Sequence, residues 1–281
     1  MQIMSLFICS LNSGSNGNCY YVGNDSEAIL VDAGISCREI EIRMKRLNLS
    51  MYSIKAVFIT HEHSDHINGV SVLSKKYDLP VYITSQTLKQ GGIKLAERLT
   101  RSFTSFKPVE IGDLTITPLP KFHDASDPYS FTVACKEVKV GVFTDTGKPC
   151  SDLLTHFGQC NAAFLEANYD EEMLEGGSYP YYLKTRIRGG HGHLSNAQAL
   201  EVFKNNRPSF MSHLILAHLS KNNNHPDLVN ELFNKYADGV KIVVASRYKE
   251  SEVYHITHSA DPAPIIKKPL LRPSQLAFSF A

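Results

Sequence analysis

This 281-residue chain lacks the sequence features that are typical of membrane proteins, of exported proteins and of proteins that bind highly charged partners. No apolar run reaches the roughly 20 residues that cross a bilayer, so no membrane association is expected. The start, MQIMSLFICS, has neither a basic region nor a small-residue cleavage site, and we interpret it as a first strand rather than a signal peptide. The formal net charge is only +1, so any binding of nucleic acid must come from a local patch.

The chain also lacks a CxxC pair and any internal repeat of fixed period. Without an export signal, its six cysteines are expected to be reduced and mostly buried, and the location to be cytoplasmic. Hydrophobic residues make up 43% of the chain, which is enough for a substantial core. The length fits one large domain or two small ones.

Short β-type runs and amphipathic segments share the chain up to residue 245. Apolar residues at helical spacing predict helices over 37–48, 67–77, 197–204 and 226–236. Apolar runs predict strands over 5–9, 19–22, 28–32, 56–60, 80–84, 102–106, 114–117, 131–135, 138–144, 162–165, 213–217 and 241–245. Because the strands come in groups, we expect an α+β fold with mixed sheets packed on each other and helices outside. Residues 1–258 are expected to form this domain, and 259–281, rich in Pro and Lys, a C-terminal tail.

The sharpest motif is the segment Thr60–His66, with the sequence THEHSDH, which follows an apolar strand and precedes a helix. Imidazole nitrogens and a carboxylate suit Zn²⁺, Mn²⁺ or Fe. Three histidines and one aspartate within six positions can serve two ions from one loop. The alternative, a solvated histidine-rich loop, is disfavoured because the chain has only 12 histidines and three of them fall in this segment.

This HxHxDH run resembles the metallo-β-lactamase superfamily, and the resemblance extends over nearly the whole chain. It implies a four-layer αβ/βα sandwich of two mixed β-sheets flanked by helices, with the metals at one edge of the sheets. Asp32, at the end of a strand, resembles the first motif of that family, where the aspartate usually supports the ligands from behind. His123, Asp145 and His218 resemble the third, fourth and fifth motifs.

The resemblance further implies a dinuclear centre, with zinc as the expected metal and manganese or iron as alternatives. Asp145 and a hydroxide would lie between the ions, and the hydroxide would attack the substrate. His225 competes with His218 for the last position, and the sequence leaves both open. The implied ligands are His61, His63 and His123 for one ion, and Asp65, His66 and His218 for the other.

Two later segments resemble the phosphodiesterase branch of the superfamily that includes ribonuclease Z. Glu166 follows a short strand, and His193 precedes the predicted helix. In that branch the carboxylate orients the histidine, which protonates the leaving oxygen. The chain departs from the ribonuclease Z pattern at Leu165, where that enzyme has histidine, and capping roles for Glu166 and His193 remain the alternative. Asp65, Glu166 and His193 are the predicted catalytic residues.

A narrower likeness rests on the segments SGSNGNC, THEHSDHINGV, LEANYDEEML, YPYYLKTRI, GHLSN and LAHLSKNNN. Together they resemble the YycJ/WalJ group, small bacterial proteins of this fold that are believed to be DNA exonucleases. Segment 179–188 interleaves aromatic and basic residues, which suits stacked bases and phosphates. The candidate nucleic-acid contacts are Tyr181, where the family usually has Trp, and Lys184, Arg186 and Arg188. A solvated face with half-buried tyrosines is the competing interpretation.

The last residues, Gln275–Phe280 (QLAFSF), resemble the peptide by which bacterial DNA enzymes dock on the sliding clamp. The Pro-rich lead suits a flexible tether. A terminal strand that packs on its own domain is the alternative.

These observations predict a metal-dependent phosphodiesterase or nuclease, with a DNA exonuclease favoured over an RNA enzyme. The alternative is a small-molecule hydrolase of the same fold that acts on thioesters, lactones or β-lactams. Such an enzyme does not need Glu166 and His193. The metal, the polarity of cleavage and the oligomeric state are not determined by the sequence.

Overall fold

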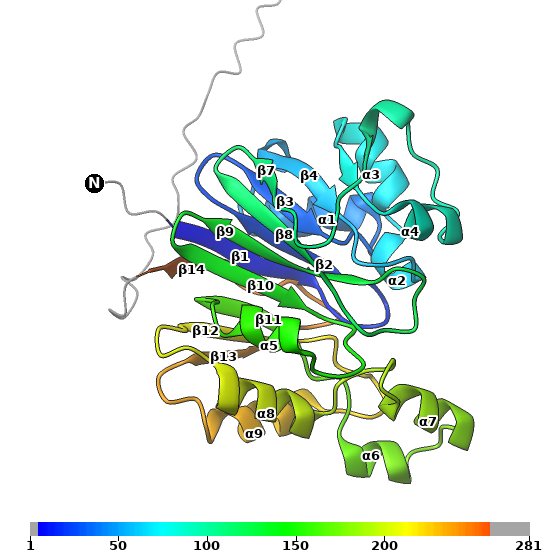
Figure 1. The fold of residues 1–281 in the computed structure, drawn as a ribbon, viewed down its shortest axis with the longest axis vertical. Coiled ribbons are helices and arrows are strands. Elements are labelled where there is room, and N and C mark those ends of the chain that lie inside the picture. Colours follow the sequence, from blue (N-terminus) through cyan, green and yellow to red (C-terminus); the bar gives the residue numbers. More distant parts are fainter. Residues whose placement is uncertain (1–4, 259–281) are drawn as a thin grey trace, which may run out of the picture.

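Two seven-stranded mixed β-sheets form the centre of the protein, and helices lie outside them (Figure 1). The computed structural model describes residues 5–258. The first sheet has the order β14-β1-β2-β3-β4-β5-β6 and the second the order β13-β12-β11-β10-β9-β8-β7. The strands are β1 (Ser5–Asn12), β2 (Cys19–Gly23), β3 (Ala28–Val31), β4 (Ile54–Phe58), β5 (Val81–Tyr82), β6 (Thr100–Arg101), β7 (Val109–Ile111), β8 (Leu114–Pro120), β9 (Tyr129–Cys135), β10 (Val138–Phe143), β11 (Ala162–Glu166), β12 (His213–Ala217), β13 (Lys241–Val244) and β14 (Tyr254–Thr257).

Most helices pack an apolar face against the outer face of a sheet, whereas the helix Tyr181–Arg188 buries no residue. Several helices begin at a side-chain cap. The helix α8 begins with a capping box in which Ser195 and Gln198 exchange hydrogen bonds. The helices are α1 (Cys37–Arg46), α2 (Ser64–Ile67), α3 (Val70–Tyr77), α4 (Ser85–Gln90), α5 (Ser151–Phe157), α6 (Glu171–Gly176), α7 (Tyr181–Arg188), α8 (Asn196–Asn206) and α9 (Pro226–Asn234), with short 3₁₀ turns at Met51–Ser53 and Glu97–Leu99.

The main core lies between the two sheets. Side chains from both sheets meet there, and the rings of Tyr20 on β2 and Phe164 on β11 lie 4.9 Å apart. Two further apolar clusters fill the space between each sheet and its helices. This layering explains why the central strands are buried on both faces and appear as continuous apolar runs in the sequence. It confirms the predicted four-layer architecture.

Parallel pairing brings the polar ends of several strands to one edge. β3 and β4 run parallel in the first sheet, as do β10, β11, β12 and β13 in the second. Side chains that follow parallel strands therefore collect outside their carboxyl ends, which is where open α/β sheets bind ligands. The candidate residues Asp32, His61, Asp145, Glu166 and His218 all stand at such ends.

Two of the predicted elements differ from the structure. Residues 102–106 form no strand, because the chain turns at Phe106, whose φ is 61° and whose N–H donates to Pro118 O at 2.8 Å. The helix predicted over 67–77 begins only at Val70, as α3, and Gly69 separates it from the short helix α2, which ends at Ile67. A Cβ at Gly69 would lie 2.1 Å from Ile35 O, so the close approach of this backbone requires glycine.

The predicted tail, 259–281, and the clamp-like peptide Gln275–Phe280 lie outside the described residues, so the domain division at residue 258 stays a prediction. Within 5–258, none of the helices has the length and apolar character that a membrane span requires.

Candidate metal centre

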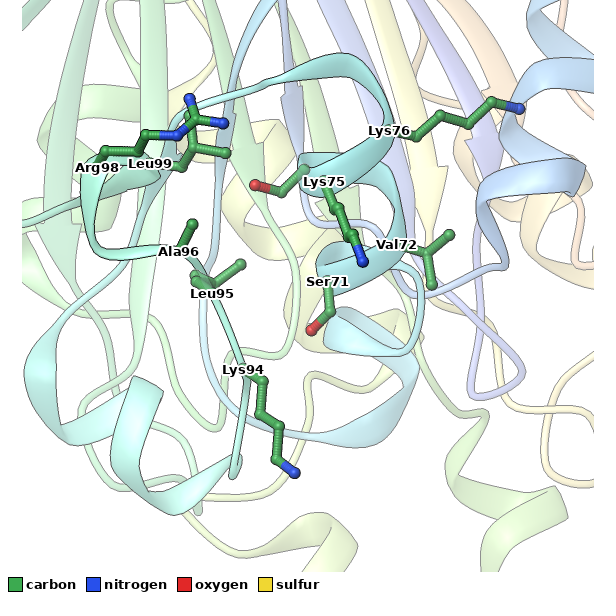
Figure 2. A pocket seen from close by; sticks show the side chains of 10 residues that line it. Ser71, Val72, Lys75, Lys76, Lys94, Leu95, Ala96, Arg98 and Leu99 are labelled. Atoms are coloured by element: carbon green, nitrogen blue, oxygen red, sulfur yellow. The ribbon is translucent and has the colours of Figure 1, made fainter.

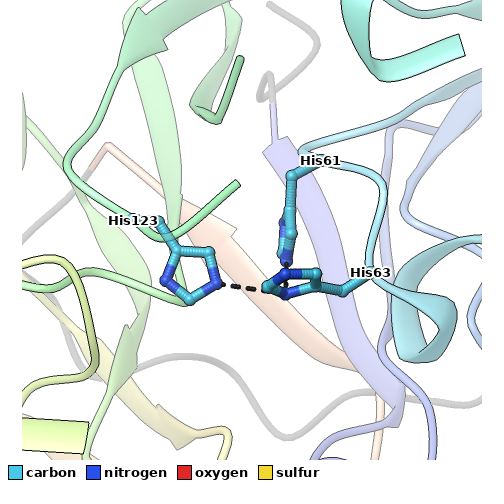
Figure 3. A group of neighbouring side chains, drawn as sticks. All are labelled: His61, His63 and His123. Carbon is cyan, nitrogen blue, oxygen red and sulfur yellow. Dashed lines mark hydrogen bonds between the residues drawn. The ribbon is translucent and has the colours of Figure 1, made fainter. Parts of the chain in front are cut away.

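Three histidine rings converge between the β4–α2 loop and the loop after β8. Figure 3 shows His61, His63 and His123 with their ring nitrogens facing one another. His61 Nε2 lies 3.1 Å from His63 Nδ1, which lies 3.3 Å from His123 Nε2. Burial lowers the pKa of His61 well below its usual range and that of His123 to about 3, so these two rings are neutral and each has a nitrogen lone pair to offer.

A second cluster lies beside the first and contains two carboxylates. His66 Nε2 is 3.6 Å from Asp65 Oδ2 and 3.3 Å from Asp145 Oδ2. His218 Nε2 lies 3.5 Å from Asp65 Oδ2. Burial alone would lower the pKa of His218, but Asp145 and Glu166 raise it to about 10. The carboxylates thus favour positive charge in this cluster, which a bound cation can supply in place of the ring protons.

These side chains fit divalent metal ions in both chemistry and spacing. Ligand atoms around a tetrahedral ion with bonds of about 2.1 Å lie about 3.4 Å apart. The distances in the two clusters, from 3.1 to 3.6 Å, are close to this value. Asp145 Oδ2 and His218 Nε2 are buried and make no hydrogen bond among the described residues, which is expected of atoms placed to meet an ion.

Hydrogen bonds from behind fix how each ring faces the clusters. The carboxylate of Asp32 accepts from His66 Nδ1 at 2.6 Å and from Thr60 Oγ1 at 2.8 Å. Thr60 Oγ1 in turn lies 2.8 Å from His61 Nδ1. His123 Nδ1 donates to Gly192 O at 3.0 Å. Each bond occupies Nδ1 and leaves Nε2 to the cluster, the arrangement that orients metal-binding histidines.

Glu166 is fully buried at the end of β11 and holds two histidines at once. Its Oε1 accepts from His193 Nδ1 at 2.7 Å and from His218 Nδ1 at 3.0 Å. Its Oε2 accepts the backbone N–H groups of Thr146 and Leu194. Burial alone would raise the pKa of Glu166, but His193 beside it lowers that pKa to about 2, so the carboxylate is ionised at neutral pH. The predicted Glu166–His193 pair is thus present, and Glu166 also orients His218.

Three of the candidate residues have left-handed backbone conformations. The φ angles are 62° at Asp32, 53° at Asp145 and 57° at His218. Each such conformation costs a non-glycine residue about 1–3 kcal/mol and persists only where the surrounding structure enforces it. All three closely follow buried strands, where the sharp turn aims the side chain back into the cluster.

The β1–β2 loop contains residues that the sequence analysis did not assign to the site. Asn18 Nδ2 donates to Asp65 Oδ2 at 3.1 Å, and its backbone N–H donates to Asp65 O at 2.7 Å. Ser13 Oγ accepts the N–H of His218 at 2.8 Å. The SGSNGNC segment could have indicated this role, because small polar residues in a loop next to a polar site commonly hydrogen-bond backbone groups.

His225, the competitor of His218, lies apart from both clusters. Its side chain is 63% exposed, and its Nδ1 accepts the N–H of Asp227 at the start of α9. The imidazole therefore caps this helix. The structure brings His218, and not His225, to the other candidate ligands.

The basic and aromatic segment forms α7, next to the site. Arg186 pairs with Asp124 at 2.5 Å, and Ile187 O accepts the N–H of His193. The rings of Tyr181 and Tyr182 are 74% exposed, not half-buried. Two of the predicted contacts are engaged with Glu175, since Arg188 pairs with its carboxylate and Lys184 donates to its carbonyl. The Arg188 guanidinium lies 5.8 Å from the centre of the Tyr181 ring, and both tyrosines are accessible to solvent.

Known proteins match both the sequence and the fold. The sequence model of the Beta-lactamase superfamily domain matches residues 27–218. Exodeoxyribonuclease YycJ of Bacillus anthracis is 36% identical over 80% of this chain and 86% of its own length. Exodeoxyribonuclease WalJ of Streptococcus pneumoniae R6 is 34% identical over 79% of this chain and 86% of its own length. The metallo-β-lactamase fold protein YhfI of Bacillus subtilis superimposes with a TM-score of 0.70 over 89% of this chain and 99% of its own, at 15% identity.

Two packed mixed sheets with a histidine and carboxylate cluster at their common edge define a metal-dependent hydrolase of the metallo-β-lactamase class. Within that class, two relatives with 34–36% identity over 86% of their own length identify the narrower group. The chain belongs to the YycJ/WalJ group of the metallo-β-lactamase superfamily.

The positions of His218 and His225 lead to a paired test. We expect His218→Ala to reduce bound metal from about two ions per chain to about one, because a site that loses one of its few protein ligands binds weakly. His225→Ala should leave the metal content unchanged. Elemental analysis of the purified, folded variants measures both. Loss of metal in His225→Ala with full content in His218→Ala would contradict the assignment.

Proposed function

We propose that this protein is a cytoplasmic, metal-dependent nuclease that hydrolyses phosphodiester bonds in DNA. The observation that carries the proposal is the hydrogen bond of 2.7 Å between His193 Nδ1 and the buried carboxylate of Glu166, beside the candidate metal ligands. Hydrolysis of a phosphodiester releases an alkoxide, a poor leaving group that requires a proton. Hydrolysis of a thioester or an activated lactam does not require a histidine in this place.

His193 is placed to donate that proton. Its Nδ1 is occupied by Glu166, and its side chain is 21% exposed while Glu166 is fully buried. The buried carboxylate holds Nδ1 and orients the ring, and the opposite nitrogen, Nε2, is left for the substrate. His193 therefore acts as the general acid in this proposal, and Glu166 positions it.

The metal ions would be held by the residues of the two clusters. When bound, two divalent ions supply hydroxide at neutral pH and neutralise charge on the phosphate oxygens. Asp145 faces both clusters and is the candidate bridge, with Oδ1 3.9 Å from His123 Nε2 and Oδ2 3.3 Å from His66 Nε2. Zinc suits the donor set best, and manganese or iron would also fit. The proposed ligands are His61, His63, Asp65, His66, His123, Asp145 and His218, with Asp32 behind them.

The preference for DNA is supported by the names of the two relatives, both exodeoxyribonucleases that match over most of their length. The exposed rings of Tyr181 and Tyr182 on α7 suit bases of a single strand, which stack on aromatic side chains without regard to sequence.

The proposal predicts metal-dependent cleavage of end-labelled DNA. We expect wild-type protein loaded with Zn²⁺ or Mn²⁺ to shorten a labelled oligodeoxynucleotide, and Asp145→Ala to lose nearly all of this activity. Gel analysis of the products also gives the polarity. The same assay with RNA tests the preference. Cleavage of neither DNA nor RNA by a protein shown to contain metal would overturn the proposal and favour a thioester or lactone hydrolase.

The role of His193 predicts an effect that depends on the leaving group. His193→Ala should slow cleavage of DNA about 10²–10⁴-fold, the usual contribution of a general acid. Cleavage of bis(4-nitrophenyl) phosphate should fall by less than about tenfold, because nitrophenolate leaves without a proton. Glu166→Gln should show the same pattern more weakly. An equal loss on both substrates would show that His193 only supports the structure.

We also propose that Gln275–Phe280 docks on the sliding clamp, on the basis of its sequence alone. Removal of residues 273–281 should weaken binding to purified clamp at least about tenfold in surface plasmon resonance, since Leu276, Phe278 and Phe280 would supply the apolar contacts. DNA cleavage in the absence of clamp should be unchanged. Undiminished clamp binding by the shortened chain would exclude this role.

A further inference from the structure

A cationic pocket lies at the carboxyl ends of β12 and β13, next to the candidate metal centre. Its volume is 490 Å³, within the range of about 300–1,000 Å³ that small-molecule sites occupy. One wall is formed by Leu219 and Ser220, which directly follow His218. Ser13, also in the wall, accepts the N–H of His218 at 2.8 Å. Pocket and metal centre thus share a stretch of backbone.

The order of the strands places this pocket beyond the cluster along the same edge. Asp145 follows β10, Glu166 ends β11 and His218 follows β12, while the pocket is bounded by the ends of β12 and β13. Neighbouring strands lie about 4.8 Å apart, so the pocket is roughly one to two strand spacings from His218. A chain held at the metal centre can therefore place its next nucleotide in the pocket.

The charge of the lining favours an anion. Lys221, Arg247 and Lys249 contribute three positive charges, and no aspartate or glutamate lines the pocket. Lys221 and Lys249 are exposed and form no ion pair within residues 5–258. Arg247 is held in place, since its Nη2 donates to Leu219 O at 3.1 Å and to Ser15 Oγ at 3.2 Å. Two exposed cations and one anchored cation thus line one cavity.

The lining also offers a surface for a base. Tyr248 lines the pocket, and its side chain is 72% exposed. Unpaired cations beside an exposed aromatic ring are the combination with which proteins bind the phosphate and the base of a single-stranded nucleotide. From these features we propose that the pocket binds the phosphate and base of the nucleotide next to the scissile bond. This inference rests on the proposed nuclease function and extends it.

A second hollow has unpaired cations in its lining but no aromatic ring. Figure 2 shows the cavity of 780 Å³ between α3 and the segment after α4. Four cations line this hollow, and two of them are paired, Lys76 with Glu41 and Arg98 with Asp78. None of its lining residues belongs to the loops of the candidate metal centre. Lys75 and Lys94 in this hollow therefore provide a matched control for Lys221 and Lys249.

The test compares the two lysine pairs in the full-length, metal-loaded protein. Lys221→Ala/Lys249→Ala should raise KM for a labelled oligodeoxynucleotide about tenfold and leave kcat within about twofold. The slope of log Kd against log salt concentration, measured by anisotropy with a phosphorothioate oligonucleotide, should fall by about 0.7 for each phosphate that the variant no longer neutralises. Lys75→Ala/Lys94→Ala should change neither quantity. Lys221→Arg/Lys249→Arg should restore wild-type behaviour.

The outcomes separate this inference from the nuclease proposal. If the wild type cleaves DNA but the Lys221/Lys249 variant has unchanged KM, Kd and salt slope, the pocket does not bind the substrate and the inference is overturned. If the wild type cleaves no nucleic acid, the nuclease proposal fails, and the anisotropy measurement alone decides whether the pocket binds a nucleotide chain. An equal loss of affinity in both lysine pairs would show general attraction by charge and would also overturn the inference.

Discussion

The buried carboxylate of Glu166 is the interaction on which the arrangement of the site depends. An ionised group with no exposure to water costs several kcal/mol unless its oxygens are fully hydrogen-bonded. Two backbone N–H groups and two imidazoles satisfy those of Glu166. The same four bonds tie together the loop after β10, the segment before α8 and the turn after β12. Movement of any of these elements would leave a charge unsatisfied in the core, so the carboxylate constrains both His193 and His218.

Asp32, at the end of a strand of the first sheet, orients histidines in the same way as Glu166. It joins the end of β3 to His66 and, through Thr60, to His61. The two carboxylates thus approach the centre from opposite sheets, and each aligns histidines from behind. The left-handed turns at Asp32, Asp145 and His218 are tolerated in this setting because the surrounding hydrogen bonds enforce them. Rigid strand ends and short polar loops together give the precision that a metal centre requires.

Much of the fold and most of the candidate ligands were predictable from the sequence. The candidate ligands follow apolar strands, and such runs are recognisable because parallel strands are buried on both faces. His61 and His218 could therefore be located at strand ends, and likeness to a family supplied the pairing between distant segments. Long-range contacts without such a likeness were not predictable. Asn18 reaches Asp65 across 47 positions, and β14 completes the first sheet beside β1. The choice between His218 and His225 likewise needed the turn after β12, which no local pattern reveals.

The polar residues around the centre are of two kinds, those buried and hydrogen-bonded within the protein and those exposed to solvent. Inside, Asp32, Glu166 and Asn18 are buried and bonded to groups of the protein itself. Outside, the lysines of the β12–β13 pocket and the tyrosines of α7 are exposed. Ordering a long charged side chain costs entropy that a surface ion pair barely offsets, so unpaired cations gain nothing for the fold. Their collection beside the candidate metal centre is what the proposed binding of an anionic chain along the edge of the sheet requires.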